Sequence, residues 1–144
     1  MAYEWDSSLE TGYERVDNQH QQLIEAVNTL VDARATGKGD KVVTETLYFL
    51  VGYAIEHFSE EEELQLWFKY PDYLNHKQQH DEFKIKVSEL VQRVEDEGPT
   101  VEIINLLSST VVTWLIDHIR NEDFRMATFI KAAISDSGGN KAFN

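Results

Sequence analysis

Hydrophobic residues recur at intervals of three and four positions through most of this chain, which is the period of helices with one buried face. The alternation typical of strands is missing between the few turn signals. Those signals are Gly37 and Gly39, Tyr70-Pro71-Asp72, Gly98-Pro99 and Ser137-Gly138-Gly139. The uninterrupted stretches predict four helices, with bounds uncertain by a few residues, at 18–36, 41–69, 73–97 and 100–134.

Short breaks between consecutive long helices favour antiparallel neighbours. The sequence therefore predicts an all-α protein, an up-down-up-down antiparallel four-helix bundle over residues 18–134. Residues 1–17 form an N-terminal arm in this interpretation, and residues 135–144 form a polar C-terminal tail.

The inward stripe of each predicted helix contains histidine. On the second helix the stripe is Val43, Leu47, Leu50, Ala54, His57, Glu61 and Leu64, and on the third it is Tyr73, His76, His80, Phe83, Val87, Leu90 and Val94. On the first it is His20, Leu23, Val27 and Leu30, and on the fourth it is Ile104, Leu107, Val111, Trp114, Leu115 and His118. All five histidines of the protein thus lie on apolar stripes.

A single core histidine is usually a hydrogen-bonded structural residue, but five converging imidazoles are harder to explain by packing. Burying each without strong partners costs roughly several kcal/mol, and a domain has only about 5–15 kcal/mol of net stability. A metal cluster offsets this loss. Imidazole and carboxylate ligands without thiolate suit iron, manganese or zinc, and five nitrogens with two carboxylates are too many for one ion.

Spacing supports two ligand pairs that meet across the core. His57 and Glu61 are four residues apart, so they lie side by side on one helix face, and His76 and His80 do the same on the next helix. Both pairs lie near the turn that joins those two helices.

The fourth helix leaves two candidates for a second ligand. Regular α-helical spacing from His118 selects Glu122, but that register continues into Arg125. A shift of one residue selects Asp123 and continues through apolar positions at Met126, Ala127, Ile130 and Ile134. The pattern predicts a π-bulge between His118 and Asp123, a distortion often found at functional sites.

Composition narrows the class of partner. The chain has 26 acidic and 13 basic residues and a formal net charge of -13, which argues against binding to nucleic acid or anionic membranes. It has no cysteine, which excludes disulfides, zinc–thiolate sites and iron–sulfur clusters. It begins with no secretory signal and has no apolar run long enough to span a bilayer. We expect a cytoplasmic protein, with a monomer as the default.

These residues resemble the hemerythrin family over about residues 3 to 130. The first motif is Asp17-Asn18-Gln19-His20, preceded by Trp5 and Gly12. The second is His57-Phe58-Ser59-Glu60-Glu61-Glu62, and the third is Tyr70-Pro71 followed by His76 and His80. The fourth is Trp114-Leu115-Ile116-Asp117-His118-Ile119 with Asp123 beyond it.

The resemblance implies a di-iron centre. His76, His80 and His118 would hold one iron, and His20 and His57 would hold the other, which keeps an open position. The implied bridges between the two non-heme irons (Fe2+/Fe3+) are Glu61, Asp123 and an oxo or hydroxo group. O2 would bind at the open iron and leave again as O2.

The resemblance also implies an apolar O2 pocket, walled by Phe58 and Leu115 and kept dry by Leu23, Trp114 and Ile119. Gln65 departs from the family, which commonly has methionine or another apolar residue there, so it puts the pocket lining or its access to solvent in question. We interpret the remaining acids of this segment, Glu60, Glu62 and Glu63, as a solvated face.

The function implied is reversible O2 binding for transport, storage or sensing, without catalysis. The alternative is a di-iron enzyme that reduces peroxide, nitric oxide or O2. The chain lacks the Glu-x-x-His pairs of carboxylate-rich di-iron sites, which favours binding over oxidation chemistry. A sensory domain of a signalling protein is a further possibility.

Overall fold

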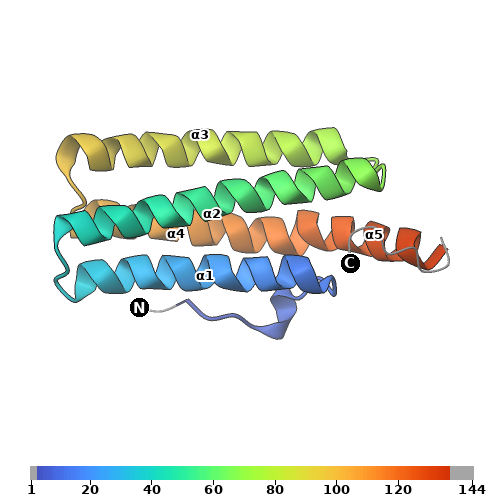
Figure 1. Ribbon diagram of the computed structural model, residues 1–144, viewed down its shortest axis with the longest axis horizontal. Helices are drawn as coiled ribbons and strands as arrows, with labels where there is room; N and C mark the ends of the chain where they lie inside the picture. Colours follow the sequence, from blue (N-terminus) through green and yellow to red (C-terminus); the bar gives the residue numbers. More distant parts are fainter. Residues whose placement is uncertain (1–2, 137–144) are drawn as a thin grey trace.

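The computed structural model describes residues 3–136 and shows the antiparallel four-helix bundle that the sequence predicts. Four long helical rods lie side by side and alternate in direction (Figure 1). The first three are α1 (Glu14–Ala35), α2 (Asp40–Trp67) and α3 (Tyr73–Glu97). The fourth rod is continuous but has three parts, α4 (Val101–His118), the π-helix η2 (Ile119–Asp123) and α5 (Phe124–Asp136).

Helix bounds differ from the prediction mainly at the N-terminus, where α1 begins four residues early, at Glu14. The N-cap residue Tyr13 makes no side-chain cap hydrogen bond, and the preceding turn is instead bonded to Asp17 inside the helix. Asp17 accepts hydrogen bonds from the backbone N–H groups of Thr11 and Gly12, at 2.9 and 3.1 Å, and from the Thr11 hydroxyl at 2.7 Å. These bonds hold the preceding turn against the first helical turn, where Gly12 has a φ of 86° that favours glycine.

The other helix ends lie within two residues of the predicted bounds. α2 ends at Trp67, and Lys69 then adopts a positive φ of 57°. α5 extends to Asp136, so Ser135 and Asp136 are helical, and the rest of the expected polar tail, 137–144, lies outside the described residues. The arm runs beside α1 and contains a short 3-10 helix, η1 (Ser7–Leu9).

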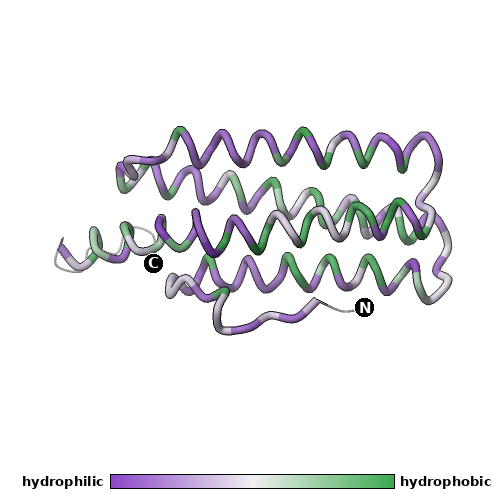
Figure 2. Tube along the Cα trace, turned by 180° about the vertical axis from the view of Figure 1, so that it is seen from behind, coloured by the Kyte–Doolittle hydropathy of each residue, from purple (hydrophilic) through white to green (hydrophobic). Residues whose placement is uncertain are grey.

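The core has two apolar parts. Hydrophobic positions recur along each rod between hydrophilic ones (Figure 2). The larger cluster fills most of the bundle and includes Leu23, Phe58, Leu107 and Leu115. The smaller cluster occupies the end near the α2–α3 turn and includes Leu64 and Met126 among its buried members. A layer of buried polar side chains lies between them, since each rod passes from one cluster to the other through a histidine or a carboxylate.

None of the helices in residues 3–136 is both long and apolar enough to cross a lipid bilayer.

Candidate metal centre

The buried layer consists of the seven residues that the sequence singled out as ligands. All of them lie in the half of the bundle that is nearer to the α2–α3 turn. All are at most 3% exposed, and they are His20 of α1, His57 and Glu61 of α2, His76 and His80 of α3, His118 of α4 and Asp123 of η2. The structure therefore brings together every residue of the predicted set.

The potential ligand atoms form two groups that share both carboxylates. One group contains His76, His80 and His118, and the other contains His20 and His57. Glu61 and Asp123 belong to both groups, and within each group the potential ligand atoms lie within 4.8 Å of one another. Two carboxylates between two sets of imidazoles are the arrangement expected of a pair of metal ions with bridging ligands.

Distances place each carboxylate between the two groups. Asp123 Oδ2 lies 3.0 Å from Nε2 of His20, and Asp123 Oδ1 lies 3.0 Å from Nε2 of His76. Glu61 Oε2 lies 3.0 Å from Nε2 of His57, and Glu61 Oε1 lies 3.2 Å from Nε2 of His80. One oxygen of each carboxylate thus faces each group of histidines.

These close contacts lack hydrogen-bond geometry. Both oxygens of Glu61 and of Asp123, and Nε2 of His20 and His57, are buried without a hydrogen-bond partner. Such atoms would lose several kcal/mol of solvation with no hydrogen bond in return. A bound cation would compensate them, because it accepts lone pairs that converge on one point. The donor set of imidazoles and carboxylates fits an iron pair.

Asp123 reaches the layer because of the π-helix. Residues Ile119–Asp123 have π-helical bonding, which confirms the bulge predicted from the shift of the apolar stripe. The wider turn puts Asp123 Oδ1 3.2 Å from Nε2 of His118. Glu122 belongs to neither ligand group, and its carboxylate, 14% exposed, accepts a hydrogen bond from the exposed Arg125 at 2.6 Å. The structure thus selects Asp123 between the two candidates that the sequence left open.

Three of the imidazoles are held from behind by side chains that the sequence did not identify. Nδ1 of His80 lies 2.8 Å from Oε2 of Glu62. Nδ1 of His57 lies 2.7 Å from Oε1 of Gln19, and Nδ1 of His118 lies 3.1 Å from Oε1 of Gln79. Each bond puts the proton on Nδ1 and leaves Nε2 free to bind a metal, which is the usual role of such partners.

The expectation that Glu60, Glu62 and Glu63 form a solvated face is wrong for Glu62, whose side chain is 14% exposed, whereas that of Glu60 is 42% exposed. Glu62 is bonded to His80, and Glu60 accepts hydrogen bonds from Arg15 and Gln19. A chain of hydrogen bonds therefore runs from Arg15 at the surface through Glu60 and Gln19 to His57. Glu63 is exposed, as expected.

The charges of the buried histidines and carboxylates stabilise one another. Burial disfavours protonated imidazole, but the nearby Asp123 and Glu61 carboxylates outweigh it, raising the pKa of His20 to about 9. The same balance raises the pKa of His76 to about 10. Burial also disfavours the charged carboxylates, yet the surrounding histidines hold the pKa of Glu61 and that of Asp123 well below their ordinary values. Protonated histidine and ionised carboxylate thus favour each other when no metal is bound.

Apolar and aromatic side chains cover the layer on the side of the larger core cluster. Leu23, Phe58, Leu115 and Ile119 are at most 2% exposed, and Trp114 is half-buried. The Phe58 ring stacks on His80, with centroids 4.2 Å apart and an interplanar angle of 21°. Trp114 stacks on His118 at 4.3 Å and 14°. The five residues expected around an O2 pocket are therefore core residues, and two of them contact layer histidines.

Gln65 lies on the other side of the layer. It is fully buried one turn beyond Glu61, and its Nε2 donates to Sδ of Met126 at 3.0 Å. It therefore packs in the smaller cluster region near the α2–α3 turn, while Phe58 and Leu115 belong to the larger one. Gln65, which departs from the residue common in the family, therefore lies outside the expected lining of the O2 pocket.

Comparison with known proteins agrees with the fold and indicates the family. Residues 11–130 match the model of the family described as Hemerythrin HHE cation binding domain. A bacteriohemerythrin of Pseudomonas paraeruginosa is 36% identical over 135 residues, which are 92% of this chain and 84% of that protein. A myohemerythrin of Theromyzon tessulatum is 30% identical over 123 residues, 85% of this chain and 89% of that protein.

A crystal structure of wild-type hemerythrin superposes with a TM-score of 0.78, at 24% identity, over 90% of this chain and 98% of that one. This likeness supports the fold. The family match and the relatives establish more, namely that the chain belongs to the hemerythrin family.

Proposed function

We propose that this protein binds O2 reversibly at a pair of non-heme iron ions held in the buried layer. The observation that carries the proposal is the division of the seven potential ligands into two groups that share Glu61 and Asp123. Membership of the hemerythrin family and similarity to bacteriohemerythrin support iron and O2. When bound, the iron pair supplies the electrons and the coordination position for O2.

The two groups differ in the number of potential ligands. The group of His76, His80 and His118 offers five residues with the shared carboxylates, and the group of His20 and His57 offers four. We assign the open position to the iron of the smaller group for this reason. The role of His57 and His20 is then to hold that iron while a position beside it stays available.

The surrounding residues act by excluding water. Leu23, Phe58, Leu115 and Ile119 are buried and carry no group that can donate a proton. A dry site without a proton donor disfavours cleavage of the O–O bond and loss of reduced oxygen. This environment favours a binding protein for transport, storage or sensing of O2 over an enzyme that consumes it.

Metal content and O2 consumption test this proposal together. Anaerobic titration with ferrous iron should saturate at two irons per chain, and the loaded protein should take up one O2 per iron pair in an oxygen electrode. Added ascorbate should cause no sustained consumption. Continued O2 consumption at many turnovers per chain would contradict the assignment as a binding protein, and saturation below two irons would contradict the di-iron centre.

A further inference from the structure

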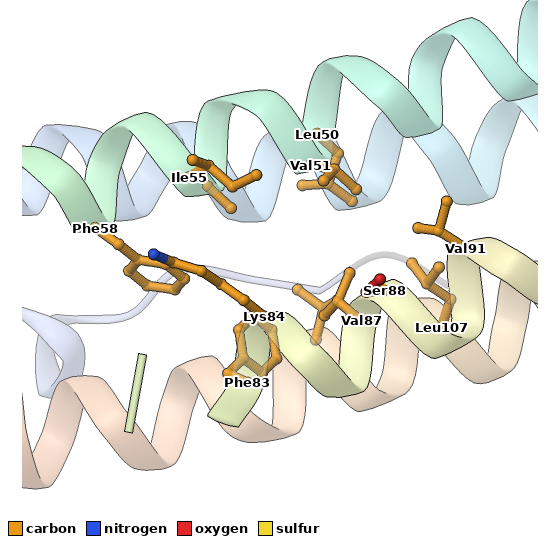
Figure 3. A pocket seen from close by; sticks show the side chains of 12 residues that line it. Leu50, Val51, Ile55, Phe58, Phe83, Lys84, Val87, Ser88, Val91 and Leu107 are labelled. Atoms are coloured by element: carbon orange, nitrogen blue, oxygen red, sulfur yellow. The ribbon is translucent and has the colours of Figure 1, made fainter. Parts of the chain in front are cut away.

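An apolar cavity lies between α2, α3 and α4, on the side of Phe58 away from the α2–α3 turn (Figure 3). Its volume is about 210 Å³. Leu50, Ala54 and Phe58 line it from α2, and Phe83 and Val87 line it from α3. The residues that line it include no aspartate or glutamate, although the chain as a whole is strongly acidic.

The size of the cavity limits its occupant. An apolar cavity of about 150 Å³ stays free of water and binds benzene, which has six carbons. By proportion, 210 Å³ accommodates a hydrocarbon of roughly eight carbons. The cavity is open to the surface where Ile55 and Ser88 are exposed, and covering its apolar wall with an apolar ligand is favourable in proportion to the area removed from water.

A single cationic side chain lies among the residues that line the cavity. In Figure 3 the side chain of Lys84 extends from α3 across the cavity toward Phe58. Its Nζ is 3.6 Å from Oδ1 of Asp81, whereas Nζ of Lys77 is 2.7 Å from Oδ2 of the same carboxylate. Because Lys77 holds Asp81 more closely, the ammonium group of Lys84 can pair with another anion.

We propose that this cavity binds a medium-chain alkyl carboxylate, such as a fatty acid of about eight carbons. The chain lies against Leu50, Ala54 and Val87, and the carboxylate pairs with Lys84. An apolar interior with one cation beside it matches a ligand with one apolar chain and one negative charge.

The occupant would contact rings that lead directly to the metal centre. Phe58 stacks on His80. Phe83 stacks on Trp114 with centroids 4.1 Å apart and an interplanar angle of 15°, and Trp114 stacks on His118. A ligand in the cavity is thus one ring from His80 and two rings from His118, and it changes the environment of the Trp114 indole.

Isothermal titration calorimetry of the purified protein with octanoate and with 1-octanol tests the proposal. Octanoate should bind once per chain. Lys84→Gln, which keeps the length of the side chain, should weaken octanoate binding three- to tenfold and change octanol binding less than twofold. Ala54→Leu, which extends into the cavity, should weaken both at least tenfold. Ala132→Leu makes the same change at an exposed position of α5 and should alter neither.

Loss of cavity binding must be separated from loss of the fold. The thermal midpoint of Ala54→Leu should equal or exceed that of the unsubstituted protein. If the midpoint of Ala54→Leu falls, its loss of binding is not informative. Ser88→Leu, which fills the cavity from the exposed side of α3, then replaces it in the binding test. Trp114 fluorescence, recorded with Trp5 and Trp67 replaced by phenylalanine, should change on addition of octanoate.

Two results would overturn the proposal. Octanoate that fails to bind, or that binds equally to the filled variants, would rule out the cavity as its site. Octanoate binding that is unchanged by Lys84→Gln would rule out recognition of the carboxylate. Both results are independent of O2, so a failure of the O2-binding function would leave this test intact.

Discussion

Asp123 lies 3.2 Å from His118, measured between Oδ1 and Nε2, although the two residues are five positions apart on one helical rod. Five positions on a regular α-helix differ by about 140° from alignment. The π-helical turn of η2 removes this difference. It also returns Met126, Ala127 and Ile130 to the core, so one local distortion serves both the site and the packing.

Asp123→Asn should therefore reduce iron binding much more than Glu122→Gln. The first change removes the charge of a proposed bridge, and we expect fewer than two irons per chain after gel filtration. The second removes the same charge from a side chain that contacts Arg125 at the surface, and two irons should remain. Equal loss in the two variants, measured by a colorimetric iron assay, would contradict the assignment of Asp123.

Much of the site could be predicted because its residues break a regular pattern. Histidines on apolar stripes can be recognised in the sequence, and so can the shift of the stripe after His118. The hydrogen-bond partners of the imidazoles could not be recognised in this way. Glu62 lies within a run of four glutamates, and which of them faces His80 depends on how α2 and α3 are rotated against each other. Gln19 and Gln79 resemble ordinary surface residues for the same reason.

Glu62→Gln tests one of these partners. The carboxylate of Glu62 makes His80 a stronger ligand, and loss of such a partner typically weakens metal binding by about 10–100-fold. We expect a loss in this range, measured by competition with a chelator. Glu63→Gln is the matched control, because Glu63 is exposed and adjacent in sequence, and it should change the affinity less than twofold. An unchanged affinity in Glu62→Gln would show that the contact is dispensable.

The metal-free protein should lose stability as the pH rises above neutrality. The ordinary pKa of histidine, 6.5, is raised to about 9 for His20 and to about 10 for His76. Their contribution to the free energy of unfolding is complete below pH 6.5 and disappears as the pH rises through 9 and 10. The pKa of Glu61 and that of Asp123 are lowered, so their contribution is lost at acid pH instead.

Thermal unfolding followed by circular dichroism measures this dependence. With a chelator present, the midpoint should be highest between about pH 5 and 6.5 and should fall toward pH 10. The midpoint of the iron-loaded protein should fall less over the same pH range, because the metal replaces the protons between the carboxylates and the histidines. A chelated protein that becomes more stable from pH 6.5 to 9.5 would contradict the proposed pairing.

Asp17→Ala should destabilise the protein by detaching the turn before α1. Asp17 accepts three hydrogen bonds from Thr11 and Gly12, and hydrogen bonds to a charged group contribute about 1.5–3 kcal/mol. We expect the free energy of unfolding in urea to fall by about 2–3 kcal/mol. Asn18→Ala changes the exposed neighbour and should have an effect below about 0.5 kcal/mol. Similar values for the two would contradict the role of Asp17 in holding this turn.

Reversible O2 binding is the central claim, and an optical cycle tests it most directly. The protein is loaded anaerobically with ferrous iron, exposed to O2 and then flushed with inert gas while the visible spectrum is recorded. Reversible binding predicts an absorption band that appears with O2, disappears when the gas is removed and returns over repeated cycles. A single irreversible change on the first exposure would contradict it and would favour a redox enzyme or redox sensor built on the same site.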